Sequence, residues 1–202
     1  MSFFLNHLTE SNSSDHWDIS GFDIGSLDQT ITRIYLVAHE NEFNQGSSSR
    51  PVLVNQWSIY LAISRTRSVQ VDFGVGKKGV VRLVDKDDTQ CFLRRSTGAF
   101  VLAISLVKHR RRRMESPIHL KVQDVLTILI RNGRDRYKVQ NDDAVADDSR
   151  FWMYTVVSDF VKEGIVEEKD RARVWKVINR YWPFPKGSRS VACPIVKGVF
   201  VS

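Results

Sequence analysis

A serine stands at the predicted start of the most regular helical segment in the chain. Residues 147–160 read DDSRFWMYTVVSDF, in which capping residue types are followed by apolar side chains at helical spacing. A hydroxyl at a helix N-terminus lies in a positive dipole field, which binds anions and favours an attacking oxyanion. Ser149 is therefore a candidate nucleophile or anion contact, and the alternative is that it only caps the helix.

Polar side chains alternate with apolar ones along two neighbouring predicted strands. Gln56, Ser58 and Tyr60 share one face of the first strand, and Gln70 and Asp72 are expected on the same face of the second. A polar stripe on a sheet usually faces solvent, and it becomes a site only where helices cover it. Together with Ser149, the candidate catalytic residues are Gln56, Tyr60 and Asp72.

The segment RNGRDRYKV, residues 131–139, combines a helix stop with alternating charges. Asn-Gly is typical of a helix C-terminus, so Arg134, Asp135 and Arg136 are expected in the turn that follows. The simplest interpretation is a C-cap followed by a local ion pair. The alternative is a guanidinium that holds a phosphate or a carboxylate through two hydrogen bonds.

A basic run, HRRRR, occupies residues 109–113. Adjacent cationic side chains attract phosphates, and each phosphate contact releases counterions. The alternative is a solvated basic turn or a nuclear-localisation-like stretch. The predicted nucleic-acid-binding set also includes lysines and arginines elsewhere in the chain, and it comprises Lys77, Lys78, Arg94, Arg95, Lys108, Arg110, Arg111, Arg112 and Arg113.

The elements that must position these residues follow an α+β pattern. Short links between the predicted strands make the sheet mostly antiparallel. Three or four helices follow in the second half, and we expect them to pack on one face of the sheet. Strands are predicted over residues 31–39, 55–64, 69–75, 79–84, 91–93 and 195–201, the last returning to the sheet. The helix candidates are residues 98–108, a segment that includes 122–129 and ends at Asn132-Gly133, residues 149–162 and residues 167–181.

The first 27 residues are rich in Ser, Asn and Asp and show no sustained period. They are expected to form a loosely ordered N-terminal arm, and its aromatic side chains are possible docking points. Residues 28–202 are expected to form a single α+β domain. The four aromatic side chains of the arm are Phe3, Phe4, Trp17 and Phe22.

Composition limits the classes of protein. With 202 residues, 42% of them hydrophobic and 26% charged, the chain fits a globular domain and not a disordered, collagen-like or disulfide-scaffold protein. The formal net charge of +7 suits an anionic partner. No apolar run reaches the roughly 18–20 residues that span a bilayer, so no membrane partner is expected.

Two distant cysteines and no signal peptide indicate a cytoplasmic protein. Nucleotide-cofactor motifs and metal-ligand spacing are missing, so we expect no cofactor and no metal.

Four segments occur in a specific order: NQWSIYL, NGRDRYKV, SRFWMYTVVSDF and the closing KGVF. Together, from about residue 31 to the C-terminus, they resemble a fungal family of small proteins of unknown function. That family is similar to the fungal arginine-containing cyclodipeptide synthases. The resemblance implies an enzyme that takes arginine from arginyl-tRNA and a second amino acid from another aminoacyl-tRNA, and releases a diketopiperazine.

The implied activity has its own requirements. A tRNA substrate needs a basic face for its phosphates and a compact pocket for the charged 3′ end. An arginine substrate needs carboxylate or aromatic partners. Asp72, Asp135 and Asp159 are the candidate carboxylates. The other candidate substrate contacts are Trp57, Tyr60, Arg134, Arg136, Trp152 and Tyr154.

A second resemblance concerns the fold. A strand that opens with a polar residue and Trp, followed much later by a helix start, is similar to circularly permuted papain-like folds of the NlpC/P60 and lecithin:retinol acyltransferase type. In that pattern a His opens the strand and a Cys opens the helix, whereas here Gln56 and Ser149 stand at those places. This departure puts thiol catalysis in doubt. It leaves a serine-based or purely positional mechanism, or an inactive homologue.

We therefore expect a tRNA-dependent cyclodipeptide synthase that uses arginyl-tRNA and a second aminoacyl-tRNA. Aminoacyl esters are already activated, so direct aminolysis depends mainly on the orientation of two substrates. One alternative is a non-catalytic module whose basic face binds RNA or an acidic partner. The other is a degenerate papain-like hydrolase or acyltransferase.

Overall fold

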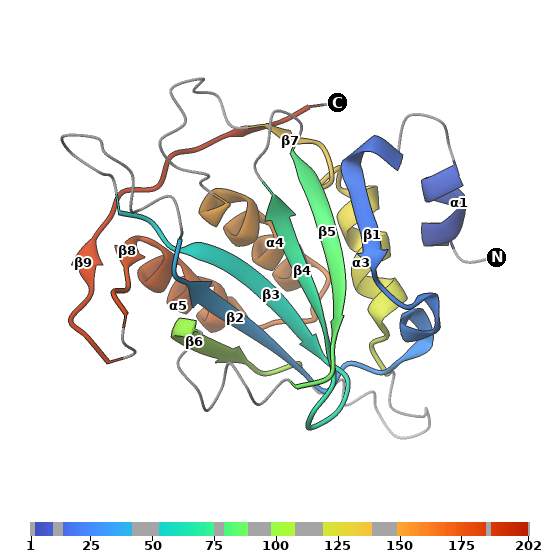
Figure 1. Cartoon of the computed structure of the whole chain (residues 1–202), viewed down its shortest axis with the longest axis horizontal. Helices are drawn as coiled ribbons and strands as arrows, with labels where there is room; N and C mark the ends of the chain where they lie inside the picture. Colours follow the sequence, from blue (N-terminus) through green and yellow to red (C-terminus); the bar gives the residue numbers. More distant parts are fainter. Residues whose placement is uncertain are drawn as a thin grey trace.

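The computed structural model describes residues 3–9, 14–41, 53–74, 79–88, 98–107, 119–138, 149–184 and 187–201. These residues form an α+β fold, in which a six-stranded sheet carries helices on one face (Figure 1). The predicted short strand at 91–93 lies outside the described residues, as does the run 109–113. No described helix is long and apolar enough to cross a bilayer.

The centre of the sheet is an antiparallel meander, as the short links predict. Its strands are β2 (Arg33–His39), β3 (Gln56–Ala62), β4 (Ser68–Gly74) and β5 (Val80–Lys86). On the outer sides, β6 (Gly98–Ile104) pairs antiparallel with β2, and β1 (Trp17–Gly21) pairs parallel with β5. The strand order is β1-β5-β4-β3-β2-β6, so the mostly antiparallel sheet is confirmed.

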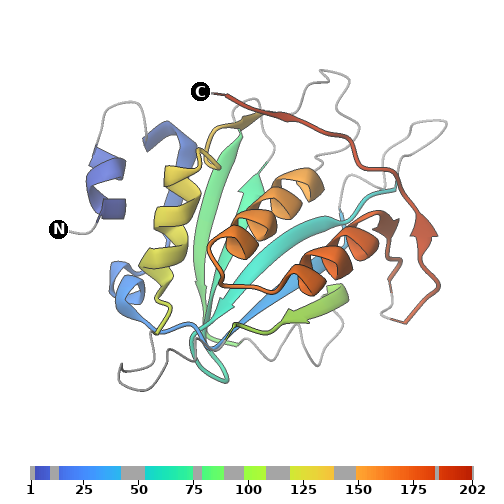
Figure 2. The ribbon, with the colours of Figure 1, turned by 180° about the vertical axis from the view of Figure 1, so that it is seen from behind.

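Three helices, α3 (Val122–Arg131), α4 (Arg150–Lys162) and α5 (Glu168–Ile178), lie on one face of this sheet (Figure 2). Because side chains alternate along a strand, Trp57, Ile59 and Leu61 of β3 point into the core beneath these helices. Each large apolar side chain that is fully buried there contributes about 1.5–3 kcal/mol. The alternate set of side chains points to the opposite side of the sheet, which we call the far face.

Shorter elements complete the fold. The helical ones are α1 (Phe3–Thr9) and the 3₁₀ turns η1 (Ser14–His16) and η2 (Ile24–Asp28). Two small antiparallel pairs join β7 (Tyr137–Lys138) to β10 (Val199–Phe200) and β8 (Arg180–Tyr181) to β9 (Val191–Ala192).

The segment after α3 leaves the helix through a glycine in the left-handed region. Gly133 has φ +62°, its N–H donates to the Ile130 carbonyl at 2.9 Å, and the Arg134 N–H donates to the Leu129 carbonyl at 2.8 Å. This is the Schellman arrangement that the Asn-Gly pair predicts. It ends α3 and turns the next three residues toward α4 and α1.

Residues 98–104 form β6, so the helix predicted over 98–108 is wrong for this segment. Phe100, Leu102 and Ile104 pack in the core under the helices, while Val101 packs on the far face with Val37. An apolar run of this length has no period that separates a buried strand from a helix. Pairing with the edge of β2 therefore decides its structure.

The predicted C-terminal strand does not return to the six-stranded sheet. Only Val199–Phe200 forms a strand, β10, and it pairs with β7. Gly198 allows this close approach, because a Cβ there would lie 2.3 Å from the Lys138 carbonyl oxygen. The helix predicted over 167–181 also ends earlier, at Ile178, and β8 follows it.

The described residues of the N-terminal segment, 3–9 and 14–27, are part of the fold, which corrects the expectation of a loosely ordered arm for this part of residues 1–27. β1 adds an edge strand to the sheet, and Phe4, Trp17 and Phe22 are buried in the main core. Phe4 packs edge-on against Trp17 with ring centroids 5.2 Å apart. Phe3 alone of the four predicted docking aromatics is exposed. Apolar contact thus overrides the polar composition that suggested disorder.

Candidate functional site

A polar row crosses the far face of the sheet on three neighbouring strands. In the strand register Ser58 of β3 lies opposite Asp72 of β4, and Asp72 lies opposite Arg82 of β5. Gln70 is two residues before Asp72 on the same face. Ser58, Gln70 and Asp72 are all buried, so the predicted polar stripe exists but does not face solvent.

Asp72 is the centre of this far-face cluster. Its Oδ2 accepts from the Arg82 guanidinium at 2.8 Å and from the Gln70 amide at 2.7 Å. The same amide nitrogen donates to the Ser58 hydroxyl at 3.3 Å. Both donors to Asp72 use one oxygen, and Oδ1 is buried without a hydrogen-bond partner. A buried carboxylate oxygen in this state costs free energy unless a ligand donor reaches it.

The cluster extends from the interior toward the surface. Asp72 is 1% exposed, whereas the Arg82 side chain is 47% exposed. The hydrogen bond that Arg82 donates to Asp72, followed by the charges of Asp72, Asp18 and Tyr60, raises the pKa of the Arg82 guanidinium against the opposing effect of burial. Arg82 therefore remains charged and lies at the solvent side of the buried carboxylate.

A tyrosine and a histidine pair on the same face. The Tyr60 hydroxyl lies 3.3 Å from His39 Nε2. Tyr60 packs against Val37, which is opposite Ser58 in the register. The register partner of Tyr60 on β2 is Tyr35, and His39 lies four residues further along that strand. The phenol ring therefore extends over Val37, which belongs to the same row as Ser58 and Asp72.

Sequence reasoning selected Tyr60 and Asp72 but missed Arg82 and His39. A signal for each was present. In the alternation of polar and apolar residues, Arg82 is the polar residue between Val81 and Leu83. His39 is the last residue of the first strand and lies on the same face of that strand as Tyr35. Only the pairing of β2 with β3 and of β4 with β5 shows that His39 and Arg82 share the far face.

Of the other two predicted catalytic residues, Gln56 also lies on the far face, opposite His39 in the register, whereas Ser149 lies in the helix layer. Gln56 is exposed at the start of β3, and it alternates with Trp57, whose side chain is buried on the helix face. Trp57 Nε1 is buried without a hydrogen-bond partner. Ser149 is the N-cap residue of α4 but makes no side-chain capping bond, and its buried Oγ has no partner either.

The strand start and the helix start are linked, although not as the papain-like analogy requires. Arg150, next to Ser149, donates to the carbonyls of Ile178, Cys193 and Pro194 at 2.8–3.1 Å. The Cys193 thiol donates to the Leu53 carbonyl at 3.4 Å, just before β3. Gln56, however, points away from the helix layer that holds Ser149. The paired His and Cys positions of the analogy therefore do not face one another, and a papain-like arrangement is not confirmed.

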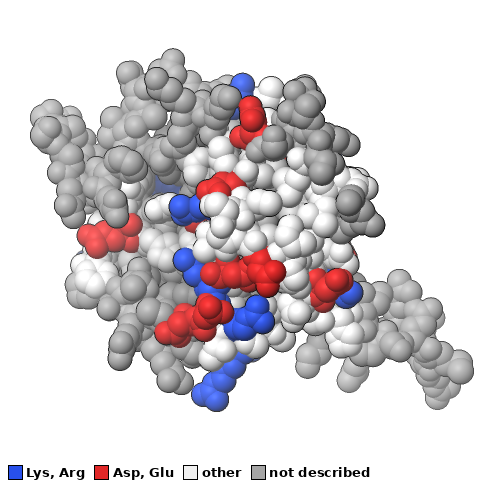
Figure 3. Space-filling view, turned by 45° about the vertical axis from the view of Figure 1, so that its right-hand side comes forward, with Lys and Arg blue, Asp and Glu red and all other residues white. Residues whose placement is uncertain are grey.

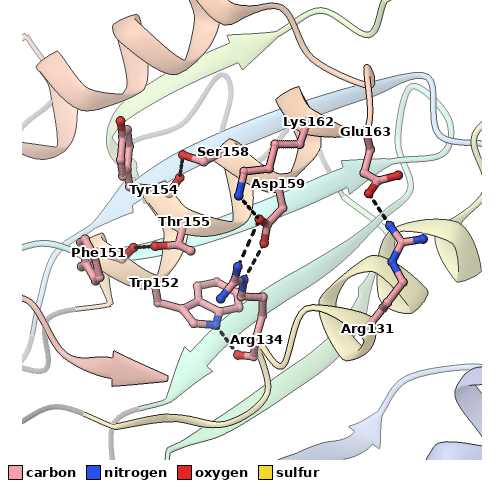
Figure 4. A network of polar contacts seen from close by, with 10 residues as sticks. All are labelled: Arg131, Arg134, Phe151, Trp152, Tyr154, Thr155, Ser158, Asp159, Lys162 and Glu163. Atoms are coloured by element: carbon pink, nitrogen blue, oxygen red, sulfur yellow. Dashed lines mark hydrogen bonds and ion pairs between the residues drawn. The ribbon is translucent and has the colours of Figure 1, made fainter. Parts of the chain in front are cut away.

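The segment RNGRDRYKV meets α4 through a second buried cluster, the helix-layer cluster (Figure 4). Arg134 donates to both oxygens of Asp159, at 2.5 Å and 3.1 Å, and Lys162 lies 3.6 Å from the same carboxylate. Trp152 Nε1 donates to the Arg134 carbonyl at 2.7 Å. The Arg134 guanidinium also lies over the Phe200 ring, 4.4 Å from its centre. The ion pair is therefore long-range rather than local.

Asp135 anchors the N-terminal segment instead of a ligand group. Its Oδ2 accepts from Trp17 Nε1 at 3.1 Å and lies 3.0 Å from His7 Nε2. The next residue, Arg136, is exposed. Tyr154 packs against Trp175 on α5, with ring centroids 4.8 Å apart. These predicted substrate contacts thus surround the helix layer and do not converge with Asp72.

The predicted nucleic-acid-binding residues, Lys77, Lys78, Arg94, Arg95, Lys108 and Arg110 to Arg113, lie outside the described residues. On the side of the molecule shown in Figure 3, the described acidic and basic side chains are intermixed. Among the described residues, no group of three or more His, Cys, Asp or Glu side chains could hold a metal ion.

The architecture defines a class: an α+β protein whose mostly antiparallel sheet carries helices on one face and a buried carboxylate cluster on the other. The chain belongs to the family described as "Domain of unknown function (DUF7770)", which matches residues 34–201. No curated protein and no solved structure matches the chain. The matched range begins within β2, so the segment that supplies His7 and Trp17 to Asp135 precedes it.

Proposed function

We propose that this protein is an aminoacyl-tRNA-dependent aminoacyltransferase that forms an arginine-containing cyclic dipeptide. The resemblance of the four sequence segments to the arginine-containing cyclodipeptide synthases is one support. The far-face cluster is the other, because it offers a buried carboxylate to a cationic side chain. A substrate guanidinium is planar and carries several N–H donors, so it suits an oxygen that lacks a donor.

The observation that carries the proposal is the difference among the three candidate carboxylates. Asp159 has donors on both oxygens, and Asp135 is held by Trp17 and His7. Asp72 alone of the three has a buried oxygen without a partner. A guanidinium N–H donating to this oxygen would satisfy it, and the adjacent Tyr60 ring offers an aromatic surface for the same cation.

The proposed reaction does not require a nucleophilic side chain of the protein. An aminoacyl ester is activated, so the amine of one aminoacyl group can attack the ester carbonyl of the other when both are held in orientation. An unactivated serine hydroxyl is a weak nucleophile, and Ser149 has no hydrogen-bonded base in the structure. Direct aminolysis on the far face therefore fits the described residues better than covalent transfer through Ser149.

The basic run supplies the tRNA-binding surface in this proposal. Replacing Arg110 to Arg113 with Ala should weaken tRNA binding and reduce its salt dependence. The log–log slope should fall by roughly one unit for each phosphate that the variant no longer neutralises. The measurement is tRNA affinity at several salt concentrations, and an unchanged slope would remove this run from the site.

The test of the proposed function is expression in a bacterial host, followed by mass spectrometry of diketopiperazines with isotopically labelled arginine. Asp72→Asn should lower product by about 100-fold, since its neutral amide cannot replace a charge-assisted hydrogen bond to the guanidinium. Asp170→Asn is the matched control, because Asp170 is also a buried carboxylate paired with a half-exposed arginine, Arg173, but lies in the helix layer.

Labelled product from the wild-type protein and the control, with its loss in Asp72→Asn, is the expected result. Equal product from Asp72→Asn and wild type would remove the guanidinium from this site. Soluble, folded wild-type protein that binds tRNA but forms no product would favour the non-catalytic RNA-binding alternative.

A further inference from the structure

We infer that Tyr60 and His39 form a proton relay for the aminoacyl transfer step. This inference rests on the proposed function, adds His39 to the candidate catalytic residues and gives Tyr60 a specific role. The geometry behind it is a phenol oxygen 3.3 Å from an imidazole nitrogen, on the same sheet face as the buried Asp72. The relay takes the proton that the attacking amine must lose.

The position of the pair suits this task. Tyr60 lies opposite Gln70 in the register, one step along the strands from the Ser58–Asp72 pair. Diagonal neighbours of this kind lie about 7 Å apart at their Cα atoms. When the substrate arginine binds Asp72 through its guanidinium, its α-amine lies at the other end of the side chain, away from the carboxylate. The group that accepts the proton of this amine must therefore lie apart from Asp72. The Tyr60 ring, which extends over Val37, occupies such a place.

Tyr60 is also close enough to the cationic end of the cluster to interact with it electrostatically. Its negative form is one of the charges that raise the pKa of Arg82. By reciprocity, the Arg82 cation favours negative charge on the phenol oxygen as a proton leaves it. A cation on the same face as a tyrosine that lies within hydrogen-bond distance of a histidine suits a relay.

The transfer step balances within these groups. The neutral amine forms a C–N bond to the ester carbonyl carbon of the other aminoacyl-tRNA, and the C–O bond to the ribose oxygen breaks. The amine passes its proton to the Tyr60 oxygen while the Tyr60 hydroxyl proton moves to His39 Nε2. The proton then returns through Tyr60 to the ribose oxygen, which leaves as a hydroxyl.

The relay requires an unprotonated Nε2 on His39, so the rate should fall when acid protonates the imidazole. Other charged and titratable groups on the far face could add further changes of rate with pH. On β2 they are Arg33 and Tyr35, on β4 Asp72, on β5 Arg82 and Lys86, and on β1 Asp18.

The experiment measures initial rates of diketopiperazine formation from purified charged tRNAs between pH 5.5 and 9. Tyr60→Phe should lower kcat by about 100-fold with KM unchanged, because it removes the hydroxyl and keeps the ring against Val37. His39→Gln should lower kcat, and the acid limb that remains should be that of the attacking amine, which must also be unprotonated. Tyr35→Phe, which removes a hydroxyl from the residue opposite Tyr60, is the matched control and should retain the wild-type kcat and acid limb.

The outcomes separate the two proposals. A wild-type enzyme that forms product, with Tyr60→Phe and His39→Gln keeping its kcat, would overturn the relay and leave the proposed function standing. A wild-type protein without product from charged tRNAs would overturn both. Circular dichroism and tRNA affinity equal to those of the wild type establish that each variant is folded and binds.

Discussion

Two buried carboxylate clusters lie on opposite sides of the sheet and differ in how their carboxylate oxygens are paired. Asp159 in the helix layer and Asp72 on the far face are each about 1% exposed and paired with an arginine. Arg134 donates to both oxygens of Asp159, whereas Arg82 and Gln70 both donate to the same oxygen of Asp72. The helix-layer carboxylate is fully satisfied, and the far-face carboxylate retains an unused acceptor.

The contrast shows that conspicuous sequence segments can be structural. NGRDRYKV, SRFWMYTVVSDF and KGVF meet one another: Arg134 pairs with Asp159, Trp152 donates to the Arg134 carbonyl, and the Gly198 N–H donates to the Tyr137 hydroxyl. Fully paired buried networks fix a structure, while a partly satisfied one calls for another explanation. This contrast supports the far face as the place of the proposed guanidinium site.

The largest expected difference between the clusters is in stability. Asp159→Ala should lower the free energy of unfolding by about 3–5 kcal/mol, since it leaves the Arg134 side chain, 15% exposed, as a buried unpaired charge. Asp72→Ala should cost about 1 kcal/mol or less, because the Arg82 side chain is 47% exposed and can be hydrated. Urea unfolding of both variants measures the difference.

A ligand sharpens the same comparison. Agmatine, a guanidinium amine, should raise the melting temperature of the wild type and of Asp170→Asn but not of Asp72→Asn, because a ligand that binds only the folded state stabilises it. Equal costs for Asp72→Ala and Asp159→Ala, with no agmatine effect, would make both clusters purely structural.

The far-face stripe can be predicted from sequence because the residues that define it lie in two strands that are adjacent in the chain. Alternation along two adjacent strands and a short link between them are enough to place Ser58, Tyr60 and Asp72 on one face. The same reasoning finds α3 and α4, whose periods and glycine stops are strong. It fails for β6, where a uniformly apolar run has no period and the neighbouring strand decides.

The pairings that give each cluster its character are not local. Arg134 and Asp159 are 25 residues apart, and His7 and Asp135 are 128 residues apart. No spacing rule connects such positions, so a local ion pair in RNGRDRYKV is the natural expectation from sequence. The burial of the far-face stripe is likewise a tertiary property, because a period of two gives its face but not its exposure.

A smaller effect is expected where the N-terminal segment joins the helix-layer side. Trp17→Phe should lower the free energy of unfolding by about 1.5–3 kcal/mol, since it removes a hydrogen bond to the buried Asp135 carboxylate. Trp182→Phe is the matched control, because its indole donates to the neutral Val177 carbonyl and should cost less. A larger cost for Trp182→Phe in chemical denaturation would remove the special role of Asp135.

Ser149 gives a third comparison, with another hydroxyl on the same helix. Sequence reasoning expects Ser149→Ala to cost about 1 kcal/mol as a lost cap. The structure reverses this expectation, because the buried hydroxyl has no partner, and its removal should leave stability unchanged or raise it by up to about 1 kcal/mol. Ser158→Ala, which removes a 2.7 Å bond to the Tyr154 carbonyl, is the control. Greater destabilisation by Ser149→Ala would show that its hydroxyl is satisfied in solution.

The smallest effect concerns a partly exposed carboxylate in the same row as Asp72. Asp18 lies opposite Arg82 in the register, and hydrogen bonds from the Ser20 hydroxyl and backbone, more than the Arg82 charge, lower its pKa below the ordinary value. Its contribution to stability is therefore fully present above the unfolded-state pKa of about 3.9 and is lost as pH falls through the lower folded-state pKa. Carboxyl-carbon NMR titration should show the Asp18 pKa rising toward the ordinary value in Ser20→Ala and rising less in Arg82→Gln. If Arg82→Gln gives the larger rise, Arg82 is shared between the two carboxylates, and Asp72 has a weaker hold on its counter-ion than the far-face cluster implies.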